Sequence, residues 1–163
     1  MKTFFIFLSL LVCLSCNSLK NFEEYPDCPE GYDCNAELIK DTSILILEDT
    51  IGKNYVKLED SDKYHTIKYT YGYQSSPQLA DANYSEVIFF QIPADTDNYQ
   101  LNGKEVKTAN FIVAKFCFCP DAGYEIINDG SINVAVEDNK YFVSLDFLVN
   151  KRMKLNRIKT IIN

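Results

Sequence analysis

The stretch SINVAVEDNKYFVSLDFLV, residues 131–149, decides the fold class of this chain. Its second half alternates apolar and polar residues, with Tyr141, Val143, Leu145, Phe147 and Val149 on one face. Successive side chains of a β-strand point to opposite faces, so this alternation predicts a strand with one buried face. Asp138-Asn139, between the two apolar runs, is typical of a tight turn. The stretch therefore predicts two antiparallel strands joined by a hairpin.

Similar runs recur along the chain, and we predict strands at 43–47, 54–58, 63–73, 87–92, 111–118 and 153–162. Asn102-Gly103 and Asp129-Gly130 are dipeptides typical of two-residue hairpin turns, which predicts hairpins of 99–101 with 104–107 and of 125–128 with 131–136. Short strands with turns every 8 to 12 residues or so are typical of sandwiches and barrels. We expect an all-β fold, an antiparallel sandwich or barrel built from consecutive hairpins, in a single domain at 36–163.

Composition excludes several classes of function. The chain has 163 residues, a formal net charge of −7, one His and no Trp. A general nucleic-acid binder needs a basic surface to displace counterions, so we expect no nucleic-acid partner. The chain contains no P-loop, no G-x-S-x-G and no H-E-x-x-H motif, and one His cannot build a His-rich metal site. We therefore expect no enzyme, no cofactor and no metal.

The N-terminus indicates export. Lys2 precedes an apolar run at 4–14, which is shorter than the roughly 20 residues that span a bilayer, and this predicts a signal peptide at 1–15. Leu14-Ser15-Cys16 resembles the lipobox of bacterial lipoproteins. The resemblance implies a diacylglyceryl thioether on Cys16, cleavage after Ser15 and acylation, for example by palmitate, of the new amino terminus. Two or more acyl chains would anchor the protein stably to a membrane.

Residues 16–35 are polar and acidic, which predicts a tether between the lipid and the domain. Similar acidic tracts follow the lipidated Cys in surface-exported lipoproteins of Bacteroidota-type bacteria. The segments 116–120 (FCFCP), Gly123-Tyr124 and 130–132 (GSI) also resemble small uncharacterised lipoproteins of that group. The resemblance implies a β-rich domain in the cell envelope, anchored to the outer membrane on its periplasmic or surface face.

Four cysteines remain once Cys13 and Cys16 are set aside, namely Cys28, Cys34, Cys117 and Cys119. An even number in an exported chain predicts disulfides. In a strand, Cys117 and Cys119 would lie about 6.6 Å apart, near the upper limit for a bridge. This favours a staple from the Cys28/Cys34 segment onto Cys117/Cys119. The alternatives are a local Cys28–Cys34 bridge with a free dithiol, or a zinc site whose spacing lacks the usual paired C-x2-C.

Five residues around the end of strand 63–73 are candidates for ligand binding: Tyr69, Tyr71, Tyr73, Gln74 and Tyr84. Tyr offers a flat apolar ring with a polar tip, which suits sugars, peptides and protein partners. In the alternative interpretation, the same rings fill the core and only their hydroxyls reach water. His65 lies on the same face, where a structural role is expected.

The sequence favours a lipid-anchored lipoprotein of the envelope or cell surface that acts as a non-catalytic binding or interaction module. Its expected partners are the membrane, through the lipid anchor, and an envelope protein or a glycan. One alternative is a carrier of a small apolar ligand with a lipocalin-like barrel, which requires a cavity inside the sheet. Another is a glycosidase that uses Glu86 and Asp146 as paired acids.

Overall fold

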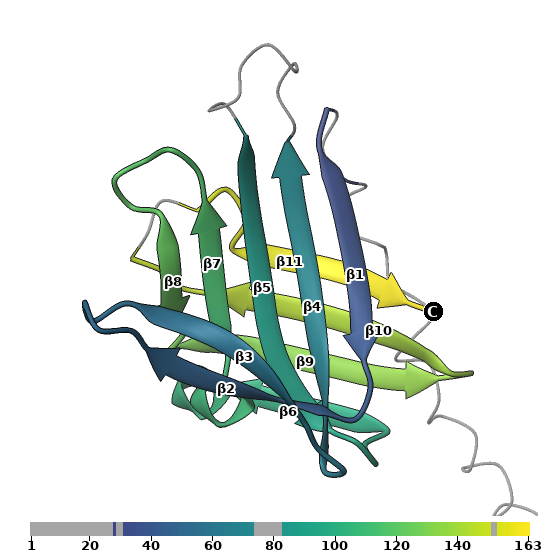
Figure 1. The fold of residues 1–163 in the computed structure, drawn as a ribbon. Coiled ribbons are helices and arrows are strands. Elements are labelled where there is room, and N and C mark those ends of the chain that lie inside the picture. The colour runs from purple at the N-terminus through teal and green to yellow at the C-terminus, as the bar shows by residue number, and fades with distance from the viewer. Residues whose placement is uncertain (1–27, 29–30, 74–82, 151–152) are drawn as a thin grey trace, which may run out of the picture.

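The computed structural model describes residues 28, 31–73, 83–150 and 153–163 (Figure 1). The predicted signal peptide, Cys16 as the predicted lipidation site, most of the predicted tether and the candidate ligand residue Gln74 lie outside these described residues. Within the described part, the chain forms two antiparallel sheets, a separate β-hairpin and a short 3₁₀ helix. No helix in this part is long and apolar enough to cross a bilayer.

The larger sheet has the order β1-β4-β5-β7-β8. Its strands are β1 (Asp33–Ile39), β4 (Tyr64–Tyr73), β5 (Tyr84–Pro93), β7 (Ile112–Phe116) and β8 (Gly123–Ile126). The second sheet, of order β11-β10-β9-β6, contains β11 (Arg157–Ile162), β10 (Lys140–Phe147), β9 (Gly130–Glu137) and β6 (Asn98–Asn102). Figure 1 shows the strands of this sheet running across those of the larger sheet, on its rear side.

The β2–β3 hairpin, β2 (Thr42–Glu48) with β3 (Asn54–Asp60), covers the lower part of the front of the larger sheet (Figure 1). Gln91 of β5 fixes the hairpin in place, because its Oε1 accepts the backbone N–H of Ile44 at 3.1 Å. Asn110 donates to the carbonyl of Ile44 at 2.9 Å. The hairpin leaves the upper part of this face uncovered among the described residues, and the candidate site lies there.

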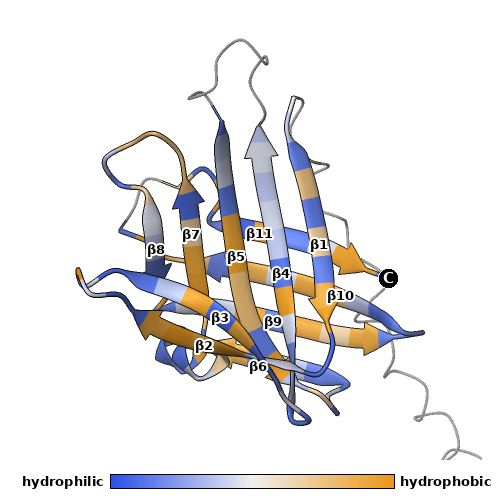
Figure 2. Cartoon of the chain, viewed as in Figure 1, coloured by the Kyte–Doolittle hydropathy of each residue, from blue (hydrophilic) through white to orange (hydrophobic). Residues whose placement is uncertain are grey.

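The core lies between the two sheets, where the apolar stripes of both meet (Figure 2). Phe90, Phe111 and Phe147 are each at most 1% exposed. Their rings touch in sequence, with centroids 5.9 Å apart for Phe90–Phe111 and 5.2 Å apart for Phe111–Phe147. The sheets are not closed into a barrel, so of the two expected architectures the structure has the sandwich.

The hairpin expected in 131–149 is confirmed. β9 and β10 pair from Glu137 opposite Lys140 to Gly130 opposite Phe147. The two turn residues, Asp138 and Asn139, both have positive φ, at 51° and 60°. Two consecutive left-handed residues form the turn type whose twist matches that of paired strands, and Asp and Asn tolerate this conformation.

The two hairpins expected at Asn102-Gly103 and Asp129-Gly130 are wrong. After Asn102 the chain enters the 3₁₀ helix η1 (Gly103–Ala109), because Val106 and Ala109, three residues apart, lie on one side and are fully buried. Asp129-Gly130 connects β8 in one sheet to β9 in the other. The chain passes from one sheet to the other at this point, so Asp129-Gly130 does not join two paired strands.

The disulfide staple favoured from the sequence is also wrong. Both bridges are local, Cys28–Cys34 and Cys117–Cys119. β7 ends at Phe116, and the bend that follows brings the Cα atoms of Cys117 and Cys119 to 5.3 Å, closer than in an extended strand. Cys34 lies within β1, an edge strand that starts at Asp33, inside the segment expected to be tether.

Candidate functional site

Strand alternation gives β4 two different faces. Tyr69 and Tyr71 share the inward face with Ile67, which belongs to the core cluster. Tyr71 is 3% exposed, whereas Tyr73, at the end of the strand, is 42% exposed. Most of the predicted tyrosines therefore pack in the upper end of the sandwich, as in the alternative interpretation.

Glu86 of β5 is buried between the sheet and residues 154–155 at this end of the sandwich. It lies opposite Tyr71 on β4, and its side chain is fully buried. Its carboxylate accepts the backbone N–H groups of Lys154 at 2.5 Å and Leu155 at 3.1 Å, and also the hydroxyl of Tyr84. A buried carboxylate with three donors is stabilised by them and holds residues 154–155 against the sheet.

An aromatic and cationic cluster covers Glu86. Tyr32 stacks on Tyr71 with ring centroids 4.7 Å apart. The Lys154 ammonium donates to the Tyr32 hydroxyl at 2.5 Å and lies 4.7 Å from the Tyr32 ring centre and 4.9 Å from that of Tyr84. The hydrogen bond from Lys154 lowers the pKa of Tyr32, while burial raises the pKa of Tyr71 to about 12 and also raises the pKa of Tyr84. The cluster satisfies its own polar groups and holds the end of the sandwich together.

The two acids considered for a glycosidase do not act together. Glu86 binds the backbone of residues 154–155, as described above. Asp146 on β10 instead accepts from Arg157 of β11 at 2.8 Å and 3.0 Å. Each of these two carboxylates has its own structural partner, so Glu86 and Asp146 are not the acid pair that the glycosidase interpretation requires.

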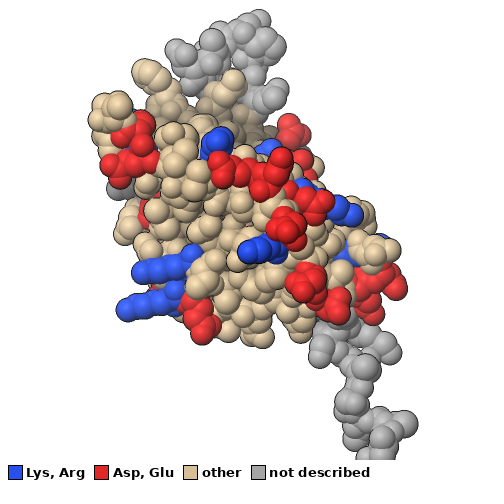
Figure 3. Space-filling view, turned by 60° about the horizontal axis from the view of Figure 1, so that its bottom comes forward, with Lys and Arg blue, Asp and Glu red and all other residues tan. Residues whose placement is uncertain are grey.

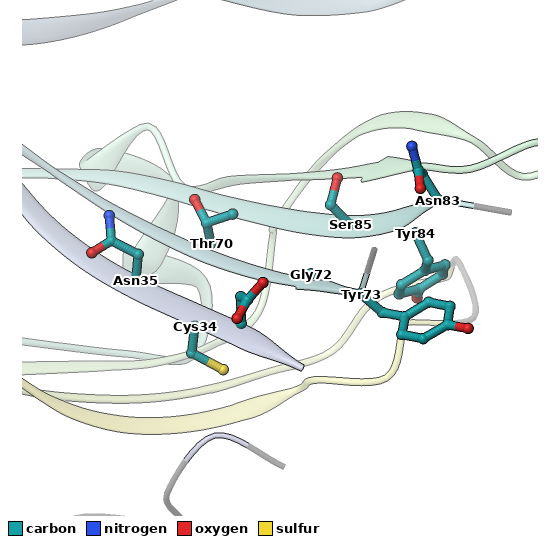
Figure 4. Close-up of a pocket in the computed structure, with 9 residues that line it drawn as sticks. Cys34, Asn35, Thr70, Gly72, Tyr73, Asn83, Tyr84 and Ser85 are labelled. Atoms are coloured by element: carbon teal, nitrogen blue, oxygen red, sulfur yellow. The ribbon is translucent and has the colours of Figure 1, made fainter. Parts of the chain in front are cut away.

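The outward face of the same strands carries a groove of about 360 Å³ (Figure 4). The residues that line it are Asp33, Cys34, Asn35, Thr70, Gly72, Tyr73, Asn83, Tyr84 and Ser85. Figure 4 shows the side chains of Asn35, Thr70, Asn83 and Ser85 on one side of the sheet and those of Cys34, Tyr73 and Tyr84 on the other. The lining therefore combines polar side chains on one side of the sheet with Cys34 and the rings of Tyr73 and Tyr84 on the other.

The groove is hollow over Gly72 because this residue has no side chain. It lies opposite Asp33 on β1 and opposite Ser85 on β5, so these two side chains flank a residue that has none. Two strand spacings separate them, a width of roughly 10 Å between backbones. A Cβ added at Gly72 would meet nothing closer than 3.6 Å, from Ser85 Cβ and the Tyr84 carbonyl. The floor of the groove is thus open above the backbone of Gly72.

Several polar side chains of the groove have no hydrogen-bond partner among the described residues. Within the part of the chain that the structure describes, no hydrogen bond engages the side chains of Asp33, Asn35, Thr70 or Ser85. Asp33 is the one residue among the lining set that is charged at neutral pH. On the same face, the row next to Asn35 and Thr70 contains Glu37 and Lys68. These two side chains form an ion pair at 2.6 Å, so the carboxylate of Glu37 offsets the positive charge of Lys68.

The sequence predicted only part of this site. Tyr73 and Tyr84, two of the five candidate ligand residues, line the groove. Tyr69 and Tyr71 lie on the inward face of β4, and Asp33 and Asn35 fall within the predicted tether. The one available signal was the alternation in 63–73, which puts Thr70 and Gly72 on a common second face.

Two other features carry no ligand site. Cys117, Cys119 and Asp121 are close enough to share a metal ion, but both thiols are in a disulfide and Asp121 accepts from Lys115 at 2.8 Å. His65, 9% exposed, accepts the backbone N–H of Asp41 at 3.0 Å through Nδ1, the structural role expected for it.

The charged surface does not form a basic patch on the face in Figure 3. Lys and Arg side chains there are interspersed with acidic ones. This distribution agrees with the net charge of −7 and gives nucleic acid no continuous basic surface on that face.

Comparison with known proteins gives no relative from which a role could be transferred: no family model matches the chain, and no curated protein or solved structure is significantly similar to it.

Proposed function

We propose that this protein is a lipid-anchored component of the bacterial cell envelope, held at the outer membrane through Cys16, and that it binds a ligand without transforming it. The observation that carries the binding role is the groove over Gly72. There Asp33, Asn35, Thr70 and Ser85 present polar groups that form no hydrogen bond with another described residue. The anchor rests on the signal peptide and lipobox pattern of residues 1–16.

The chemistry of the groove favours binding over catalysis. General acid–base or nucleophilic catalysis needs a titratable group with a partner that tunes it. Asp33 is the one charged lining residue, and Cys34 is committed to a disulfide. Neutral amides and hydroxyls on rigid strands are instead well suited to orient a bound molecule.

A carrier of apolar ligands has less support. That function needs an enclosed apolar cavity, as in the interior of a barrel. Here the sheets form an open sandwich, and Phe90, Phe111 and Phe147 fill the space between them.

The anchor can be tested by labelling. Cells expressing the full chain and grown with radiolabelled palmitate should yield a labelled protein in the membrane fraction, and Cys16→Ala should be unlabelled. Equal labelling of both proteins would refute lipidation at Cys16.

The binding role can be tested with the full-length Cys16→Ala chain, in which no lipid can carry the protein into a membrane pellet. We expect it to cosediment with an envelope fraction from the source bacterium. Gly72→Val, which fills the groove floor, should reduce this binding at least tenfold. Ser144→Val places a valine side chain on the outward face of β10, away from the groove, and this variant should bind the envelope fraction normally. Undiminished cosedimentation of Gly72→Val would refute the proposed function.

A further inference from the structure

The register of three strands brings four groove residues together around one glycine. Asp33, Gly72 and Ser85 form one row across β1, β4 and β5, and Asn35 and Thr70 lie side by side in the next row. The other four residues thus surround a shallow floor formed by the backbone of Gly72. A six-membered ring can lie flat over Gly72, with its substituents directed at the polar side chains around it.

The polar groups of the groove define what such a ring must carry. A carboxylate accepts hydrogen bonds, a hydroxyl both donates and accepts, and an amide does one at each end. A ligand that meets Asp33, Asn35, Thr70 and Ser85 together therefore needs several groups that both donate and accept. An apolar ligand would desolvate these side chains without replacing their hydrogen bonds to water, which is unfavourable.

The charge of the groove selects against anions. Asp33 supplies a negative charge, and the described residues that line the groove include no Lys, Arg or His. On the same face of the sheet, Lys68 in the neighbouring row is paired with Glu37 at 2.6 Å. Lys115 and Lys154 lie near the Tyr84 ring, where Lys115 pairs with Asp121 at 2.8 Å and Lys154 donates to the Tyr32 hydroxyl. A phosphate, sulfate or carboxylate in the groove would meet a like charge, whereas a neutral or amino-bearing ligand would not.

The direction of the side chains distinguishes a sugar from a peptide. A peptide strand that extends a sheet pairs with the backbone along the free edge, which here would be the edge of β1. The groove side chains instead stand on the face of the sheet (Figure 4). Recognition on this face must proceed through side chains, as hydroxyl groups around a sugar ring permit.

We infer that the groove over Gly72 binds a neutral or amino-bearing saccharide, with one sugar ring on the glycine and its hydroxyls bonded to Asp33, Asn35, Thr70 and Ser85. This inference rests on the proposed binding function and specifies its ligand class. Tyr73 and Tyr84 also line the groove. Because Figure 4 places their rings on the opposite side of the sheet from Asn35, Thr70 and Ser85, hydrogen bonds rather than stacking hold a sugar ring that lies over Gly72. Such a site is weak singly, and many anchored copies on one membrane would act together on a polymer.

The test uses the full-length Cys16→Ala chain, immobilised at high density, with defined polysaccharides as probes in a biolayer interferometry experiment. The probes are mannan, dextran and soluble chitin oligosaccharides as uncharged ligands, and alginate as an anionic ligand. We expect binding to at least one uncharged probe and none to alginate. Gly72→Val should abolish that binding. Asp33→Asn should weaken it about tenfold or more, because a hydrogen bond to a charged group is lost.

Asp62→Asn is the matched control, since Asp62 is an exposed residue before the other end of β4 and should leave binding unchanged. Circular dichroism of each variant confirms that the sandwich is retained. Preference for alginate, binding that survives Gly72→Val, or no binding to any uncharged probe would overturn the saccharide assignment. If the envelope fraction still binds in a Gly72-dependent way while all saccharides fail, the ligand class is wrong and the binding role stands. If that dependence is lost as well, the proposed function itself fails.

Discussion

Two glycines in this sandwich should respond to the same substitution in opposite ways. At Gly72 an added Cβ meets only Ser85 Cβ and the Tyr84 carbonyl, both at 3.6 Å, which is ordinary van der Waals contact. At Gly130 the added atom would lie 2.4 Å from the Asp146 carbonyl oxygen and 2.9 Å from the Phe147 Cα. These obstacles are backbone atoms of β10, so they cannot rotate away.

The magnitudes follow from these distances. Gly72→Ala removes conformational freedom from the unfolded chain without strain in the strand, which should raise the free energy of unfolding by about 0.4–1 kcal/mol. Gly130→Ala forces β9 and β10 apart at the pair Gly130–Phe147 and should lower the free energy of unfolding by about 3 kcal/mol. At roughly 2–4 °C per kcal/mol, Tm should rise slightly for Gly72→Ala and fall by about 6–12 °C for Gly130→Ala.

The assay is thermal unfolding of the full-length Cys16→Ala chain and of both variants in this background, followed by circular dichroism under non-reducing conditions. A fall in Tm for Gly72→Ala as large as that for Gly130→Ala would mean that the space above Gly72 is filled. In that case the groove, and with it the ligand site, would not exist as described.

Three further outcomes are expected. Glu86→Ala should lower the free energy of unfolding by about 2–3 kcal/mol in urea, because two backbone N–H groups and a hydroxyl lose their acceptor; an unchanged midpoint would contradict this structural role of Glu86. The pKa of Tyr71 is about 12 in the folded protein and near 10 in the unfolded chain, so the unfolded state loses its proton first and stability should decline between pH 10 and 12. Tyr71→Phe should show a shallower decline over that range, and identical slopes would argue against the assignment. Under non-reducing conditions the tryptic peptide 116–140 should carry Cys117 and Cys119 as an internal bridge, and its covalent attachment to peptide 21–40 would contradict the observed pairing.

The parts of the fold that could be predicted are those that depend on neighbours in the sequence. The β9–β10 hairpin needs an alternating run on each side and two residues that accept positive φ, and Asp138-Asn139 supplies them. Asn102-Gly103 offered the same local signal, but burial of Val106 and Ala109 converts the following segment to a 3₁₀ helix. Turn chemistry alone cannot distinguish these outcomes, because packing of the next residues decides between them.

Only Tyr73 and Tyr84 of the candidate site could be predicted, because its polar residues meet through register. Asp33, Gly72 and Ser85 are far apart in the sequence and become neighbours only when β1 and β5 both pair with β4. The tyrosines of β4 gave the stronger pattern, but alternation turns Tyr71 into the sandwich. A glycine that matters because it lacks a side chain leaves no positive signal in the sequence.

The most direct test of the saccharide site is the amide NMR spectrum of the full-length Cys16→Ala chain, titrated with the uncharged saccharide that binds best. We expect the largest shift changes at Asp33, Asn35, Gly72 and Ser85, with the amide of Phe118, exposed on the disulfide loop after β7, unaffected. Shift changes centred on that loop or on the inward tyrosines, with none at Gly72, would contradict the assignment of the groove as the ligand site.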